Sequence, residues 1–169
     1  EYMQSADRLA KLSGYRHGMG ENDRLDWKIN PDGTDMDAKI IRAAFNKASS
    51  MGTTGRCAEG FQLGVQRFAP ELVGTGDGVA MRHALARSSN FQQVDWQTAQ
   101  EALRAGKAVA VSRQWAGGDS RNGGHVALLA YDRGRIMEAS DHVTQFNKNN
   151  GRYATNKDVF FVYRGDKGT

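Results

Sequence analysis

The hydrophobic residues of this chain change their spacing near residue 106, from a helical repeat to short apolar runs. Before that point, the clearest stripe lies between residues 34 and 49, where Thr34 or Asp35 can cap the first turn. Its apolar positions recur three or four residues apart: Ile40, Ile41, Ala44, Phe45 and Ala48. This spacing is typical of a helix with one buried face, so we predict a helix over residues 34–49.

Four shorter segments also have helical spacing or helix boundary signals. Residues 5–14 carry Ser5 as a candidate N-cap, and residues 57–68 follow the glycine-broken loop "MGTTG". Residues 79–89 form a third such segment, and residues 95–106 begin with Asp95 as a cap and end at Gly106. We therefore predict helices in all four segments and an irregular connection over residues 15–35.

Beyond Gly106 the apolar residues occur in short runs of strand length, separated by Gly, Asp or Asn. The runs are "KAVAVSR", "HVALLAYD", "GRIMEAS", "HVTQFN" and "DVFFVYR". Such runs predict an antiparallel sheet. Helices first and strands later predict an α+β fold with the helices packed on one side of this sheet.

The composition sets the class of protein. A chain of 169 residues with 39% hydrophobic residues fits one domain, in which we expect residues 1–50 to be a helical N-terminal extension of a core over 51–169. A single cysteine excludes an internal disulfide, and no Cys/His cluster has zinc-ligand spacing, so we expect neither a metal nor a cofactor. No segment has the roughly 18 apolar residues of a membrane helix, and the first residues lack the apolar stretch of a signal peptide.

The net charge is a weaker guide to partners. The chain carries a formal charge of +4, but its Lys and Arg residues are scattered and form no nucleic-acid-binding motif. We therefore expect no nucleic acid and no membrane among its partners, and a monomer in solution.

The only cysteine, Cys57, stands where a predicted helix begins. Backbone N–H groups and the positive end of the helix dipole favour a thiolate there, and the neighbouring Arg56 acts in the same direction. The amides of Arg56 and Cys57 could also form an oxyanion hole. Because a lone cysteine is more often a small buried residue, a catalytic interpretation requires a base and an orienting group elsewhere.

Candidates for both groups follow later in the chain. His125 comes after two glycines and opens a predicted central strand, where it can be held rigidly, and His142 is the reserve base. Glu138 lies in the next predicted strand, so its carboxylate can reach the His125 imidazole. Asp141 is the alternative third residue. Trp115, in the loop before His125, is either a substrate platform or an aromatic residue packed on the core.

The order of these residues resembles the papain-like NlpC-type and CHAP-type cysteine hydrolases of peptidoglycan. The resemblance rests on "TTGRCAEGF", "EALRAGKAVAVSRQ", "GGHVALL" and "RIMEAS", and it spans about residues 50 to 165. The cysteine segment looks like that of phage lytic domains and of secreted amidase effectors, including type VI secretion effectors.

The resemblance implies a papain-like fold and an amidase or endopeptidase that acts on the peptide part of peptidoglycan. Cys57 would be the nucleophile, His125 the general base and acid, and Glu138 the group that orients His125, with a thioester intermediate and no metal. It also implies secretion or delivery to the bacterial periplasm or cell wall, and an immunity protein as partner if the chain is an antibacterial effector. Two alternatives stay open: a non-catalytic binding module of the same fold, and a thiol deamidase or acyltransferase toxin acting on protein.

Overall fold

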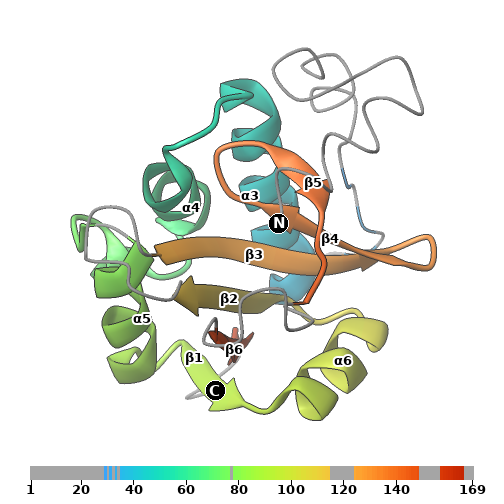
Figure 1. The fold of residues 1–169 in the computed structure, drawn as a ribbon. Coiled ribbons are helices and arrows are strands. Elements are labelled where there is room, and N and C mark those ends of the chain that lie inside the picture. Colours follow the sequence, from blue (N-terminus) through green and yellow to red (C-terminus); the bar gives the residue numbers. More distant parts are fainter. Residues whose placement is uncertain are drawn as a thin grey trace.

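The computed structural model describes residues 29, 31, 33, 35–76, 78–114, 124–148 and 157–165. Its helices are α3 (Met36–Met51), α4 (Cys57–Val65), α5 (Gly78–Arg87) and α6 (Trp96–Arg104), with a short 3-10 helix η1 (Pro70–Leu72). Its strands are β1 (Phe91–Val94), β2 (Val109–Gln114), β3 (Gly124–Asp132), β4 (Arg135–Ala139), β5 (Val143–Gln145) and β6 (Lys157–Tyr163). The predicted α+β class is confirmed (Figure 1). The predicted helix over residues 5–14 lies outside the described residues.

The six strands form one sheet in the order β1-β6-β2-β3-β4-β5. Every neighbouring pair is antiparallel, as the strand-length runs predict. Strands β2 to β5 follow one another as a meander, and β6 returns to the other side of β2. Strand β1 was not predicted, because "FQQV" has two glutamines at its centre and is extended only through its pairing with β6.

Helices cover both faces of the sheet, so the prediction of helices on one side is wrong. Helices α3, α4 and α5 lie against the face that carries Val126 and Leu128 of β3, whereas α6 packs with Ala127 and Leu129 on the opposite face. The physical reason is visible in β3, where consecutive residues from Val126 to Ala130 are apolar and buried. Because strand side chains alternate between faces, such an uninterrupted run needs cover on both sides.

Helix α3 is part of this core. Asp35 caps it by accepting a hydrogen bond from the Ala38 amide at 2.8 Å, as one of the two predicted caps. The predicted apolar stripe of α3 is buried against α4 and the sheet. A Cβ atom on Gly64 of α4 would lie 2.9 Å from the Ala44 Cα of α3, so the two helices touch through their backbones. Helix α3, within the predicted N-terminal extension, therefore packs into the same core as α4 and the sheet.

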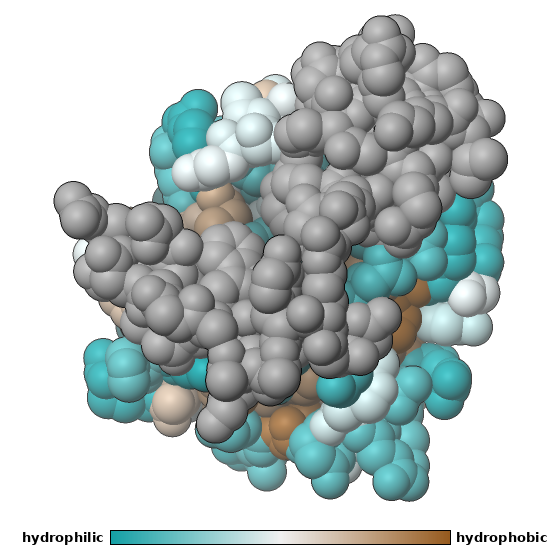
Figure 2. All heavy atoms as spheres, in the orientation of Figure 1, coloured by the Kyte–Doolittle hydropathy of each residue, from teal (hydrophilic) through white to brown (hydrophobic). Residues whose placement is uncertain are grey.

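The exposed apolar residues of the described segments are few and scattered. On the face drawn in Figure 2, the described residues are mostly hydrophilic, with apolar residues in small separate spots. The exposed large hydrophobic residues of the described segments, Met36, Val73 and Tyr131, come from three different parts of the chain. No helix in these segments is both long and apolar enough to cross a membrane.

Candidate active site

Two glycines shape the loop that brings the chain from α3 to Cys57. Gly52 has a φ of 56° and donates its N–H to the Ala48 carbonyl at 3.0 Å, and Gly55 has a φ of 85°. These left-handed conformations favour glycine, and they turn the chain so that α4 begins at Cys57. The first amides of a helix have no acceptor within it, so the thiol of Cys57 lies at the positive end of the α4 dipole.

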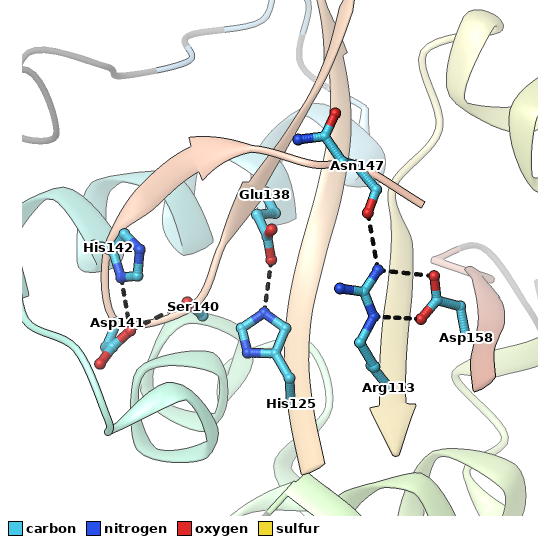
Figure 3. Close-up of polar contacts among 8 residues, drawn as sticks. All are labelled: Arg113, His125, Glu138, Ser140, Asp141, His142, Asn147 and Asp158. Atoms are coloured by element: carbon cyan, nitrogen blue, oxygen red, sulfur yellow. Dashed lines mark hydrogen bonds and ion pairs between the residues drawn. The ribbon is translucent and has the colours of Figure 1, made fainter. Parts of the chain in front are cut away.

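His125 and Glu138 form a buried pair on neighbouring strands. The register places Glu138 opposite Leu129, and Leu129 shares a face of β3 with His125 because side chains alternate along a strand. His125 Nε2 lies 2.7 Å from Glu138 Oε1, and the two residues are 4% and 1% exposed (Figure 3). An ionised carboxylate only accepts, so Nε2 donates this hydrogen bond.

The same imidazole also contacts the thiol. A side-chain hydrogen bond joins Cys57 and His125, and the backbone amide of Val126 donates a second one to the sulfur. Since Nε2 is bonded to Glu138, the ring nitrogen available to the thiol is Nδ1, which Figure 3 shows on the side of α4. The structure thus brings together the three side chains predicted from the sequence as nucleophile, base and orienting group.

The charges of this trio favour one protonation state. Burial raises the pKa of the Cys57 thiol, but the hydrogen bond and charge of His125, with the Val126 amide, lower that pKa overall. Burial lowers the pKa of His125, but the Glu138 charge and the bonds to Cys57 and Glu138 raise it to about 10. Both shifts act in one direction: they favour the proton on the imidazole and the sulfur as a thiolate, the reactive form.

Asp141, the alternative third residue, contacts other partners. Its Oδ1 lies 2.9 Å from His142 Nδ1 and accepts from the Ser140 hydroxyl at 3.2 Å. Its Oδ2 accepts from the Arg56 amide at 2.7 Å and from the Thr53 hydroxyl at 3.3 Å. The carboxylate beside His125 is that of Glu138, and Asp141 binds the loop before Cys57.

This contact changes the predicted oxyanion hole. The Arg56 N–H, one of the two amides proposed for it, donates to Asp141 Oδ2 and is directed away from that role. The Arg56 guanidinium pairs with Glu59 at the exposed surface, with Nε 2.8 Å from Oε1. The Cys57 amide, at the first position of α4, stays the candidate donor from this pair.

A second buried ion pair lies beside the trio, and sequence reasoning missed it. Arg113 of β2 is the register partner of His125 and of Asp158 in β6. Its Nε and Nη2 donate to the two Asp158 oxygens at 2.6 and 2.9 Å, and Nη2 also donates to the Asn147 carbonyl at 2.8 Å. Asp158 and, more weakly, Glu138 raise the pKa of Arg113 against the effect of burial. The sequence signal for this ion pair is Arg113 itself, a charged residue on the face of β2 that otherwise carries Val109 and Val111.

The other predicted site residues lie elsewhere. His142, the reserve base, is fully buried in the turn before β5 and faces Asp141. Trp115 lies outside the described residues. Among the residues that the structure describes, no group of three or more His, Cys, Asp or Glu side chains could hold a metal ion.

No family model matches the chain, and neither a curated protein nor a solved structure was found that matches it.

Proposed function

We propose that this protein is a cysteine hydrolase, an amidase or endopeptidase that cleaves amide bonds in the peptide part of bacterial peptidoglycan. The observation that carries the proposal is the buried imidazole of His125, which bridges the Cys57 thiol and the Glu138 carboxylate. A nucleophile, a base in contact with it and a group that orients the base are the parts that thiol hydrolysis needs.

The chemistry follows from the protonation state. The Cys57 thiolate attacks the amide carbonyl carbon, a C–S bond forms, and the carbonyl electron pair moves to oxygen. The C–N bond then breaks while His125 Nδ1 gives its proton to the departing amine, which leaves a thioester on Cys57. Nδ1 next takes a proton from water as the water attacks the thioester, and the C–S bond breaks to restore the thiolate.

Transition-state charge would be stabilised at the start of α4. The negative oxygen forms next to the sulfur, where the Cys57 amide and the positive end of the helix dipole are available. Throughout, Glu138 keeps the imidazole in one orientation and stabilises its positive charge.

The substrate class rests on two weaker observations. The motifs around Cys57, His125 and Glu138 resemble those of peptidoglycan hydrolases, and the net charge of +4 suits a polyanionic cell wall. Both support the amidase proposal over a toxin that acts on protein.

Digestion of purified peptidoglycan tests the proposal. Wild type, Cys57→Ala and the exposed α5 variant His83→Ala are each incubated with peptidoglycan, and released muropeptides are analysed by mass spectrometry. We expect products from wild type and His83→Ala and none from Cys57→Ala, and the cleaved bond identifies an amidase or an endopeptidase. Equal products from wild type and Cys57→Ala, or no products from either, would reject this function.

A further inference from the structure

Asp141 joins two segments that are 85 positions apart in the sequence. It follows β4, the strand of Glu138, and its Oδ2 accepts the Arg56 amide at 2.7 Å, one residue before Cys57. Its backbone carbonyl accepts the Thr53 amide at 3.0 Å, and its side chain accepts the Thr53 hydroxyl. One residue thus holds both ends of the loop 53–56 that leads to the thiol.

The turn that contains Asp141 also supports α4 from a second direction. A Cβ atom on Gly60 would lie 2.1 Å from the Ser140 carbonyl oxygen, so the helix backbone rests directly on this turn. The start of α4 is therefore fixed by Asp141 through its leading loop and by Ser140 through its first turn.

The carboxylate of Asp141 is itself well held. Burial raises its pKa, but the hydrogen bond and charge of His142 and the Arg56 amide lower the pKa overall. Its oxygens therefore act as charged acceptors, which make the stronger class of hydrogen bond. Its charge also acts on Cys57, where it weakly opposes the thiolate that His125 favours.

We propose that Asp141 is a positioning residue that places the Cys57 sulfur against His125 by binding the Arg56 amide. This inference rests on the proposed function, since a fixed sulfur matters for catalysis only if Cys57 is the nucleophile. Glu138 and Asp141 then serve one site from the same strand and its following turn, the first through the base and the second through the nucleophile.

Alkylation of Cys57 by iodoacetamide tests this placement without any substrate. The rate constant is measured against pH for wild type, Asp141→Ala and Asp141→Asn, with unfolding followed by circular dichroism. Asp37→Ala is the matched control, because Asp37 also joins a helix to the sheet by accepting a backbone amide, that of Ala108 at 2.9 Å, away from Cys57.

Asp141→Ala should raise the pH midpoint of alkylation toward the value of a free thiol, about 8.5, and lower the rate at pH 7 at least about tenfold. Asp141→Asn keeps an oxygen for the Arg56 amide and removes the opposing charge. Its midpoint should stay at the wild-type value or fall, and its rate should stay within about threefold of wild type. Asp37→Ala should lower the unfolding temperature and leave the midpoint unchanged.

Three results would overturn the proposal: a folded Asp141→Ala protein with the wild-type profile, an Asp141→Asn midpoint as high as that of a free thiol, or an Asp37→Ala midpoint that rises. If Asp141→Ala does not fold, an Asp141→Asn midpoint as high as that of a free thiol would still overturn the proposal. A protein that shows the expected alkylation but releases no muropeptides would refute the hydrolase proposal and leave the placement of Cys57 by Asp141 standing.

Discussion

Two buried histidine–carboxylate pairs lie close to α4, and they differ in what surrounds them. His125 and Glu138 lie on two neighbouring strands of the sheet, and the second ring nitrogen of His125 contacts the Cys57 thiol. His142 and Asp141 are adjacent in a turn, and their carboxylate meets backbone amides of the loop before Cys57. Figure 3 draws both pairs.

The comparison shows that the chemistry of a pair depends on its third partner. A histidine between a carboxylate and a thiol can pass a proton between the thiol, a leaving amine and water. A carboxylate between a histidine and backbone amides stabilises a loop conformation instead. The same two residue types thus form the proposed base in one place and a structural support in the other.

Removal of the base should have the largest effect. His125→Ala takes away the proton acceptor and the positive charge beside Cys57, so we expect muropeptide release to fall by about 10²- to 10⁴-fold. Cys57 should also lose its lowered pKa. Product formation by mass spectrometry and alkylation at pH 7 measure the two effects, and a rate within tenfold of wild type would be inconsistent with His125 as the base.

Neutralisation of the orienting group should have an intermediate effect. Glu138→Gln keeps an oxygen for His125 Nε2 but removes the charge that raises the pKa of His125. A charge-assisted hydrogen bond contributes about 1.5 to 3 kcal/mol, so we expect kcat to fall by roughly 10- to 100-fold.

The pH dependence of Glu138→Gln adds a second readout. In wild type the imidazolium persists until the pH approaches the His125 pKa of about 10. In the variant this pKa is lower, so the high-pH limb of the kcat profile should move to lower pH. A variant with reduced kcat and an unmoved high-pH limb would show that Glu138 acts only through packing.

The smallest effect on chemistry should come from the other pair. His142→Ala removes a buried partner of Asp141, and we expect the free energy of unfolding to fall by about 1 to 3 kcal/mol. His142→Asn, whose amide nitrogen can replace Nδ1, should recover part of this loss. The folded fraction of either variant should keep kcat within about threefold of wild type, because Asp141 still binds the Arg56 amide. A loss of kcat as large as that of His125→Ala would erase the distinction between the two pairs.

Much of the fold follows from local sequence. The stripe of α3 and the caps Asp35 and Asp95 identify their helices because apolar spacing and capping act within a few residues. The meander from β2 to β5 follows from short runs with turns between them. The packing of helices on both faces of the sheet was not predicted, although the continuous apolar run in β3 indicates a strand buried on both sides.

The site was predictable only in its order along the chain. Sequence placed Cys57 at a helix start and His125 at a strand start, and it favoured Glu138 over Asp141 only because Glu138 lies in the next predicted strand. That choice depends on the β3–β4 register and on where β4 ends, which pairing between strands determines. No local pattern indicates the hydrogen bond from the Arg56 amide to Asp141 or the ion pair of Arg113 with Asp158. Both join residues that are far apart in the chain.

The central claim is that Cys57 is a thiolate paired with the His125 imidazolium, and ultraviolet absorbance near the thiolate band tests it most directly. The difference in absorbance between wild type and Cys57→Ala is followed from acid to alkaline pH, first folded and then in denaturant. Because the fold lowers the Cys57 pKa, the thiolate band of the folded protein should persist to lower pH than that of the denatured protein, with a lower titration midpoint. A folded protein whose thiolate titrates with a midpoint of about 8.5, the pKa of a free cysteine, would contradict the ion pair and the mechanism built on it.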